Sequence, residues 1–349
     1  MKRLVLLFVF LLAGCDGRED GQSADEHLVD SIDPENVVQV FKQFERVESN
    51  HAHAGLISLD NLGRSVTQFL SNPDPASQHD MKQQWLQAHR DYLQENFFTL
   101  ADQSQLLFQI DAWPIQAGFL DSIKDYPQSG IINDFTVTID PDSLQEQHGI
   151  TDSREVSLGF HALEFLIFNR TADDFSLSND KIKLRRRQVM KIILDLLTRD
   201  INLAFLENRE ANRDFLSDLE GKDREDPDGL RLVIRTLHTR VQLLFSEVIY
   251  IGDGDAGHSS FSRSSWVNLR SQIAVLNELS GQQSGLRKIF ETLDQRTAHD
   301  YDLTLTEAME ILSQDNPVAE KAARIPLLFA ALGHQLGDLE IVLRNSANQ

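Results

Sequence analysis

The sequence predicts an all-α protein made of two packed helical domains, each resembling a four-helix bundle. Long segments carry apolar residues at the spacing of one helix face, as Trp85, Tyr92 and Leu93 do within residues 78–100. Only nine prolines occur in 349 residues, and long runs rich in Leu, Gln, Arg and Glu favour helix over strand. A chain of this length can bury two cores of ordinary size, so antiparallel helices joined by modest loops account best for the pattern.

The first 14 residues resemble a bacterial lipoprotein signal peptide. Two basic residues, Lys2 and Arg3, precede a short apolar run that ends in Leu12-Ala13-Gly14-Cys15, a sequence similar to a lipobox. The resemblance implies cleavage before Cys15, the only cysteine of the chain, and attachment of lipid to that residue. We therefore expect the mature protein to be anchored in a lipid bilayer, with the polar and acidic residues 15–32 as a flexible tether.

Location and charge also limit the partners. Asp16 follows the cysteine, which in enteric-type bacteria resembles a signal for retention at the inner membrane. We therefore expect a lipid-anchored periplasmic protein, with the inner membrane favoured over the outer. The net charge of −21 is a poor match for nucleic acid, whose phosphates need basic contacts. An acidic surface suits cations better, although a solvated surface is the commoner meaning of such a charge.

The helical segments that follow the tether fall into two groups. We expect the first bundle at residues 33–175 and the second at 176–349, with a polar boundary near residues 171–180. The first helix begins near Pro34, a residue suited to a first helical turn. Residues 135–139 are rich in Val, Ile and Thr and predict an excursion or a short strand. Further helices are expected at about 58–70, 181–206, 230–251 and 318–343.

One stretch, residues 158–168, is apolar at nearly every position and predicts a buried helix. Just upstream, Asp152 and Glu155 have the spacing of a capping box, which predicts that this helix starts near Ser153. The exceptions to its apolar character are a glycine, a histidine and a glutamate, and the last two need an explanation.

His161 and Glu164 are three residues apart and therefore lie on one face of the predicted helix. A buried carboxylate is costly unless it is paired, hydrogen-bonded or bound to a cation. The pair is either a satisfied polar network in a core or part of a metal site, since helix bundles build metal sites from such pairs. Two ligands are too few for a site, so other helices would have to supply the rest.

Together with the preceding glycine, the pair forms Gly159-x-His161-x-x-Glu164, which is the GxHxxE motif of the imelysin family. These proteins are also called imelysin-like or insulin-cleaving-membrane-protease-like proteins, and the chain resembles them over nearly its whole mature length. Other family features follow in order: Trp85 to Glu95 with Arg90 and Tyr92, Ala112-Trp113-Pro114 followed by Asp121, Ser129 to Asn133, Arg186-Arg187-Gln188, and His258 to Ser262.

The resemblance implies two helical bundles, with the motif helix near the cleft between them. Members of the family are typically iron-regulated or linked to iron transport, and some are classed as metallopeptidases. Carried over to this chain, the resemblance implies metal ligands at His161, Glu164, Glu95, Asp111 and Asp121 and no catalytic residue. One imidazole with several carboxylates suits Fe, Mn or Zn better than Cu(I).

The chain departs from the family pattern in its second half. Residues 263–268 contain Arg, Ser, Trp and Asn where the family often has Asp-Asn-Thr-His followed by Asp. Asn169-Arg170-Thr171 stands in place of a common Gly-Gln-Asp. Acidic and imidazole groups are thus missing there, which weakens any role of that region in binding a cation. His89, beside Arg90, is expected to cap or to pack.

Three functions remain open at this stage: metal capture linked to iron uptake, metallopeptidase activity, and a non-catalytic scaffold or adaptor. Zinc peptidases usually carry HExxH or HxxEH on one helix, but HExxH is absent from the sequence and Phe165 follows Glu164. Capture of a cation needs no turnover and suits an acidic lipoprotein, so we favour it over an enzyme. Its partner would be an iron-uptake protein or another membrane protein; the sequence leaves the metal and the oligomeric state open.

Overall fold

A computed structural model describes residues 31–99, 104–221, 227–252, 257–314 and 319–347 of the chain. The expected signal peptide, Cys15, Asp16 and residues 17–30 of the tether lie outside the described residues. The described part is all-α, as predicted, and none of it forms a strand beyond one isolated bridge between Ile123 and Tyr126.

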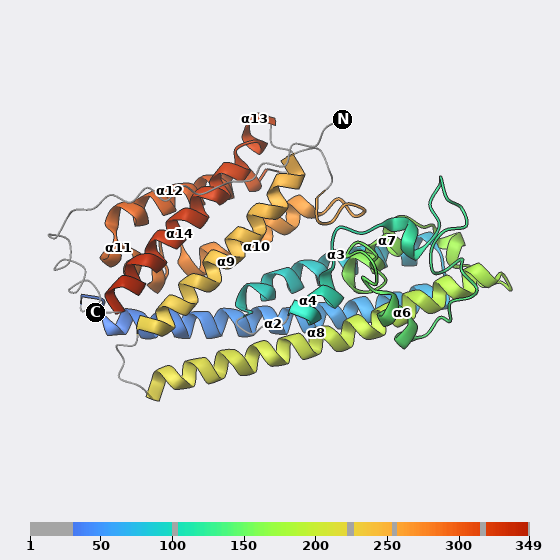
Figure 1. The fold of residues 1–349 in the computed structure, drawn as a ribbon, viewed down its shortest axis with the longest axis horizontal. Coiled ribbons are helices and arrows are strands. Elements are labelled where there is room, and N and C mark those ends of the chain that lie inside the picture. The colour runs from blue at the N-terminus through green and yellow to red at the C-terminus, as the bar shows by residue number, and fades with distance from the viewer. Residues whose placement is uncertain (1–30, 100–103, 222–226, 253–256, 315–318, 348–349) are drawn as a thin grey trace.

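Most of the chain is in long helices (Figure 1). The helices of the first half are α2 (Pro34–Ser71), α3 (Pro75–Glu95), α4 (Ser104–Asp111), α5 (Ala117–Leu120), α6 (Pro141–Gln147) and α7 (Gly159–Phe168), with 3-10 turns η1 (Asn96–Phe98) and η2 (Ala172–Phe175). Those of the second half are α8 (Lys181–Gly221), α9 (Pro227–Gly252), α10 (Ser265–Ser280), α11 (Gly285–Leu293), α12 (Gln295–Leu312), α13 (Ala319–Ala322) and α14 (Ile325–Ala347).

Local sequence explains where the first helices begin. Asp33 accepts a hydrogen bond from the backbone N–H of Glu35 at the start of α2, where proline occupies the first turn as expected. Asp74 and Ser77 form a capping box at the start of α3. The segment expected separately at residues 58–70 is the second half of α2, which is one continuous helix.

Two local predictions were wrong. The motif helix does not start near Ser153, because the Glu155 carboxylate accepts hydrogen bonds from the backbone N–H groups of Thr151 and Asp152 and closes a turn instead. Residues 135–139 form no strand. The Arg185 guanidinium holds this region in a looped shape, because it donates to four backbone carbonyls, those of Ile131, Ile132, Asp134 and Val137.

Two hydrophobic cores hold the molecule together, and α2 contributes to both. The first core combines the second half of α2 with α3, α4, α7 and α8, and it buries Trp85 and Phe165. The second combines the start of α2 with α9, α10, α11, α12 and α14, and it buries Phe44 and Phe329. α8, which follows the expected boundary at residue 175, packs in the first core, and Figure 1 shows it running beside α2. The two cores therefore interleave along the chain.

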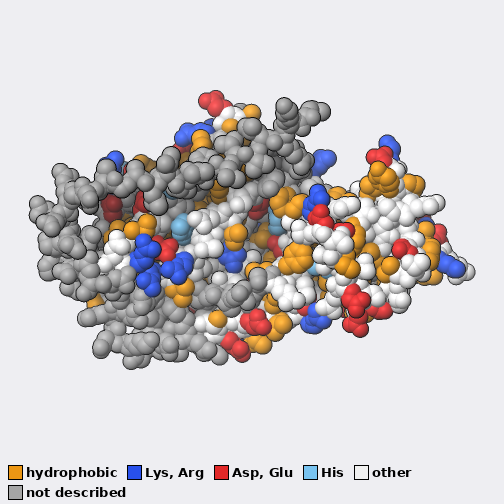
Figure 2. All heavy atoms as spheres, in the orientation of Figure 1, with side chains coloured by type: hydrophobic (Ala, Val, Ile, Leu, Met, Phe, Trp, Pro, Cys, Tyr) orange, Lys and Arg blue, Asp and Glu red, His pale blue; other side chains and the backbone are white. Residues whose placement is uncertain are grey.

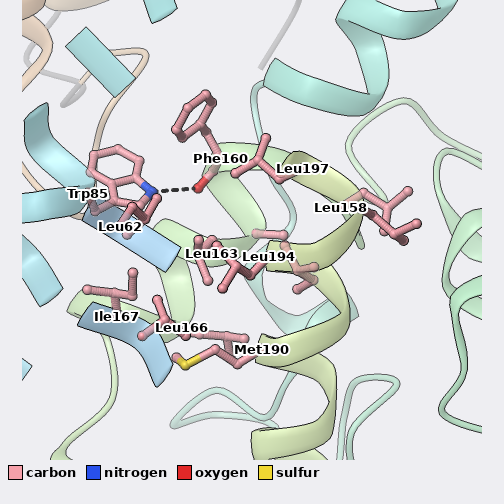
Figure 3. Packing of buried hydrophobic residues seen from close by; sticks show 14 of the residues in the cluster. Leu62, Trp85, Leu158, Phe160, Leu163, Leu166, Ile167, Met190, Leu194 and Leu197 are labelled. Atoms are coloured by element: carbon pink, nitrogen blue, oxygen red, sulfur yellow. Dashed lines mark hydrogen bonds between the residues drawn. The ribbon is translucent and has the colours of Figure 1, made fainter. Parts of the chain in front are cut away.

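α7 lies inside the first core, as predicted for a buried helix. Leu163 and Leu166 of α7 pack with Met190 of α8 and with α2 (Figure 3). The Trp85 indole N–H of α3 donates to the backbone carbonyl of Phe160 at 3.1 Å. Every residue of α7 except its last is buried. Its two polar side chains must therefore find their partners inside the protein.

One helical stretch among the described residues, Ala319–Asn345, is long and apolar enough to cross a membrane by length and composition. Its residues Phe329, Leu332 and Leu336 are fully buried in the second core, and 39% of its most apolar window is buried in all. On the face shown in Figure 2, acidic and basic side chains are interspersed over the described surface. The negative net charge is thus not gathered into one area of this face.

Candidate metal centre

The glycine of the motif brings two helices into close contact. Gly159, the first residue of α7, has a φ of +82°, and a Cβ there would lie 2.4 Å from the carbonyl oxygen of Ile110. Only glycine fits this backbone conformation and this approach. The start of α7 therefore packs directly against the end of α4, and His161 comes to lie beside Asp111, the last residue of α4.

Asp111 is the centre of a cluster of three histidines. Its Oδ1 lies 3.0 Å from Nε2 of His89 on α3 and 3.1 Å from Nε2 of His161. Its Oδ2 lies 3.3 Å from Nε2 of His258, in the segment before α10. The Nε2 atoms of His161 and His258 are 3.2 Å apart. One ligand atom from each of the four residues lies within 4.8 Å of all the others, so three imidazoles and one carboxylate converge on one point.

The remaining groups around the cluster hold these side chains in place. Glu164 accepts from Nδ1 of His161 at 2.8 Å through Oε2 and from the backbone N–H of Ser262 at 2.8 Å through Oε1. Nδ1 of His89 lies 3.4 Å from Nδ2 of Asn268 and 3.5 Å from Ser259 Oγ. Glu164 therefore orients His161 and fixes the segment that carries His258, and its two oxygens are both engaged outside the convergence point.

The electrostatics of the cluster favour a cation. Burial lowers the pKa of His89 to about 4, against the opposing effect of Asp111. Burial acts in the same direction on His161, but hydrogen bonds to Asp111 and Glu164 outweigh it and raise its pKa to about 10. Burial favours the neutral form of Asp111, yet His258 and His89 hold its pKa well below the usual range. The proton that His161 holds between Asp111 and Glu164 is therefore one that a divalent cation can displace, because metal binding releases protons from its ligands.

The donor set fits a borderline divalent metal. Imidazole suits Zn, Fe, Cu and Ni, whereas a carboxylate suits harder ions such as Mn. All three histidines present the same ring nitrogen, Nε2, and two of them have Nδ1 held by an outer group, as is usual for metal-binding histidines. His89 and His161 are at most 1% exposed, and Asp111 and His258 are 12% exposed. The cluster is thus nearly enclosed.

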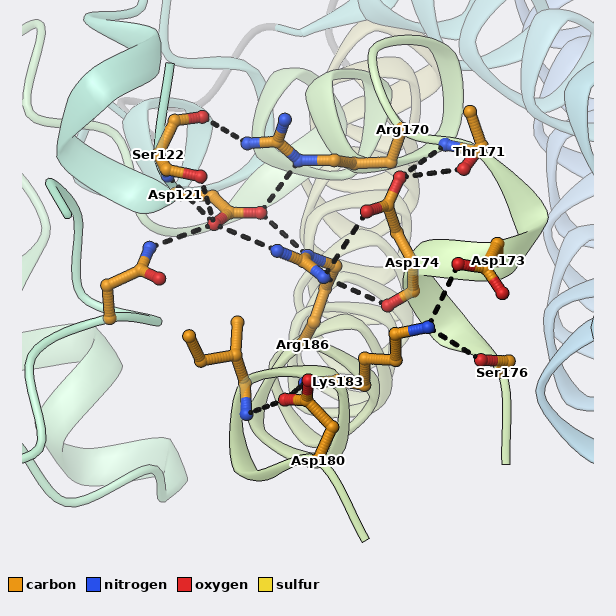
Figure 4. Close-up of polar contacts among 12 residues, drawn as sticks. Asp121, Ser122, Arg170, Thr171, Asp173, Asp174, Ser176, Asp180, Lys183 and Arg186 are labelled. Atoms are coloured by element: carbon orange, nitrogen blue, oxygen red, sulfur yellow. Dashed lines mark hydrogen bonds and ion pairs between the residues drawn. The ribbon is translucent and has the colours of Figure 1, made fainter. Parts of the chain in front are cut away.

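Two of the residues expected as ligands lie elsewhere. Glu95, at the end of α3, is buried and accepts a hydrogen bond from the Asn208 side chain at 3.1 Å. Asp121 accepts from the guanidinium groups of Arg170 and Arg186 at 2.8 and 2.7 Å (Figure 4). Of the five expected ligands, the structure brings His161 and Asp111 together, places Glu164 behind His161, and leaves Glu95 and Asp121 in separate polar clusters. Their assignment as ligands stays a prediction.

Two members of the cluster were not among the expected ligands. His89 was expected to cap or pack. It lies on the same face of α3 as Trp85 and Tyr92, one turn from each, and this face points into the first core. His258 belongs to a family-like motif in the sequence, within the half that was expected to have lost its ligands. Helical spacing on α3 and the preserved histidine of that motif were the available signals.

Comparisons with known proteins agree with the fold. The sequence matches the family model described as Imelysin (Peptidase M75) over residues 50–336. The fold resembles the crystal structure of a protein described as an iron-regulated protein A precursor from Parabacteroides distasonis ATCC 8503, with a TM-score of 0.66, 13% identity, and coverage of 89% of this chain and 96% of that one. It also resembles an imelysin-like protein from Psychrobacter arcticum 273-4, with a TM-score of 0.60, 14% identity, and coverage of 91% and 96%.

The sequence matches no curated protein. At 13% and 14% identity, the two solved structures bear on the fold alone. The family model covers most of the chain and includes all four residues of the cluster. The chain therefore belongs to the imelysin family.

Proposed function

We propose that this protein binds a divalent transition metal, Fe(II), Mn(II) or Zn(II), through His89, Asp111, His161 and His258. The observation that carries the proposal is the convergence of three Nε2 atoms and one carboxylate within 4.8 Å. Hydrogen bonding inside a core does not by itself require three imidazoles to turn the same nitrogen to one carboxylate. In metal sites, histidines usually turn one ring nitrogen to the metal while the other is held by an outer group.

We further propose that the bound metal serves iron acquisition. A structural neighbour is described as iron-regulated, and an acidic protein attached to a bilayer through Cys15 is well placed to capture cations in the periplasm. The partner would be an iron-uptake or other membrane protein, and nucleic acid would have no role. Inner-membrane attachment, from Asp16, remains part of this proposal.

The family name raises peptidase activity as a second candidate. A catalytic zinc site keeps a coordination position open to water and substrate. Here the four candidate ligands are at most 12% exposed, which favours holding a metal over acting on a peptide. A scaffold protein with a purely structural cluster is the third candidate, and it predicts no stoichiometric metal binding.

The direct test is calorimetric titration of the protein from Asp16 onward with Fe(II) under anaerobic conditions, Mn(II) and Zn(II). We expect one metal per chain, bound much more weakly by His258→Ala, which keeps three of the four ligands. His148→Ala is the matched control, because His148 is a partly buried histidine that bonds Phe108 and Ser157 outside the cluster. A wild-type protein that binds none of the three metals would contradict the proposal. Peptide hydrolysis by the metal-loaded protein, lost in His258→Ala, would favour the peptidase.

A further inference from the structure

The three imidazoles of the cluster differ at their other ring nitrogen. Nδ1 of His161 has Glu164 as its partner at 2.8 Å, and Nδ1 of His89 faces Ser259 Oγ at 3.5 Å. Nδ1 of His258 is buried and has no hydrogen-bond partner within the described residues. A metal on Nε2 would place the imidazole proton on Nδ1, where a buried donor needs an acceptor. Among the described residues, His258 therefore lacks a hydrogen-bond acceptor for its Nδ1 proton.

Glu247, on α9, offers the matching acceptor. Its Oε1 is buried and makes no hydrogen bond to any residue that the structure describes. The charged groups that act on its carboxylate are His258 first, then Asp111 and His161, so it lies within electrostatic range of the cluster. Burial raises the pKa of Glu247, as expected for a desolvated carboxylate. Near the site there are thus a buried nitrogen, Nδ1 of His258, and a buried carboxylate oxygen, Oε1 of Glu247, neither of which has a hydrogen-bond partner among the described residues.

We propose that Glu247 is the positioning residue of His258: its carboxylate accepts the Nδ1 proton of His258 when Nε2 binds the metal. It would do for His258 what Glu164 does for His161 in the structure. The inference rests on the metal-binding function proposed above. Such outer carboxylates fix the orientation of a metal-binding histidine and increase its basicity.

The position of Glu247 extends the metal centre into the second core. α9 buries Val241, Leu244 and Val248 in that core, on either side of Glu247 in the sequence. The other three ligands stand on α3, α4 and α7, which belong to the first core. A hydrogen bond between Glu247 and His258 would therefore link the two cores, and binding of the metal would stabilise the contact between them.

The test is Zn(II) affinity of the full mature chain, measured by competition with a chromophoric chelator. We expect Glu247→Ala to weaken binding about 10- to 100-fold and Glu247→Gln, which keeps an acceptor oxygen, to weaken it less. Ser246→Ala, a change at the neighbouring exposed position of α9, should bind as the wild type does. A merely structural role would lower the melting temperature of the metal-free protein. Removing an unpaired buried carboxylate should instead leave that temperature unchanged or raise it.

A second readout is the imidazole Nδ1–H signal of His258 in the ¹⁵N-histidine-labelled, Zn(II)-loaded protein. We expect this proton to be protected from solvent exchange in the wild type and to be exposed or shifted in Glu247→Ala. Wild-type Zn(II) affinity in Glu247→Ala would overturn the inference and leave the proposed function standing. Absence of Zn(II), Fe(II) and Mn(II) binding by the wild type would instead overturn the proposed function itself.

Discussion

Asp111 and Asp121 are two largely buried aspartates near the first core, and each lies at the end of a short helix, α4 or α5. Each lies against a glycine with positive φ. A Cβ on Gly159 would lie 2.4 Å from the carbonyl oxygen of Ile110, the neighbour of Asp111, and one on Gly130 would lie 2.5 Å from the backbone nitrogen of Asp121. Both aspartates were expected from the sequence to bind metal. Their partners, however, are of different kinds.

Asp121 is neutralised by groups whose charge is permanent. Arg170 and Arg186 donate to its Oδ2, while the backbone N–H of Ser122 and the Asn133 side chain donate to its Oδ1 (Figure 4). Guanidinium groups keep their protons at any physiological pH, so this cluster is complete without a cation. The imidazoles around Asp111 can lose theirs and bind a metal instead. The chemistry of the partners, and not burial or charge, separates a structural carboxylate from a candidate ligand.

The largest effect should come from Asp121→Asn. Removing one partner of a buried ion pair costs about 3–5 kcal/mol, because the other charges stay buried without compensation. We expect a loss of this size in the free energy of unfolding, measured with urea, which is the same with and without Zn(II). If Zn(II) stabilises this variant less than it stabilises the wild type, Asp121 belongs to the metal centre after all.

A third buried carboxylate, Glu95, should respond to pH. Burial, opposed by Asn208 and Arg240, raises its pKa to about 8, so folding favours the protonated form. Wild-type stability should therefore be fully present below the unfolded pKa of about 4.5, and should decline as the pH rises from there to 8. Glu95→Gln should remove that decline and raise the free energy of unfolding at pH 8 by roughly 2–3 kcal/mol. This gain is smaller than the full value of about 1.4 kcal/mol per pKa unit, because relaxation of the protein and entry of water reduce the cost of the buried charge. A gain independent of pH in denaturation series would contradict this.

The two glycines offer a matched pair of substitutions. Gly159→Ala and Gly130→Ala should each lower the free energy of unfolding by about 1–3 kcal/mol or more, because alanine is strained at positive φ and meets backbone atoms. Only Gly159→Ala should also weaken Zn(II) binding, since it moves α7 away from α4. Thermal denaturation measures the stability of each variant, and chelator competition measures its Zn(II) affinity. Equal Zn(II) affinities in the two variants would contradict the assignment of Gly159, and not Gly130, to the metal centre.

The smallest effect of this series is expected at Glu164. Glu164→Gln keeps its shape but weakens the hydrogen bond to Nδ1 of His161, and outer carboxylates of this kind contribute about 10- to 100-fold to metal affinity. Glu155→Gln serves as the control, because Glu155 closes an exposed turn away from the cluster. Complete loss of binding in Glu164→Gln would mean that Glu164 is itself a ligand, as the motif was first interpreted.

Local patterns in the sequence predicted the all-α fold, the buried α7 and the placement of His161 and Glu164 on one face of it. These depend on residues three or four apart, which a helix always places on one face. The resemblance added Asp111. The sequence did not identify His89 and His258 as ligands, because 169 positions separate them along the chain and no helical period relates a residue of α3 to one in the segment before α10.

The start of α7 shows the same limit at shorter range. Asp152 and Glu155 have the spacing of a capping box, yet Glu155 closes a turn and the helix begins at Gly159. The choice is made by tertiary packing of Gly159 on the end of α4, which local spacing does not contain. Likewise, the sequence offered Asp121 and Asp111 as equivalent candidates, because Arg170 and Arg186 approach Asp121 only in the folded chain.

X-ray absorption spectroscopy of the Zn(II)-loaded protein from Asp16 onward tests the central claim most directly, because it counts imidazole ligands. The account predicts three imidazole nitrogens at about 2.0–2.1 Å with carboxylate oxygen completing the shell, and two imidazoles when His258 is replaced by alanine. A shell of one imidazole and mostly oxygen atoms, unchanged in His258→Ala, would contradict the account and return the site to His161 with separate carboxylates.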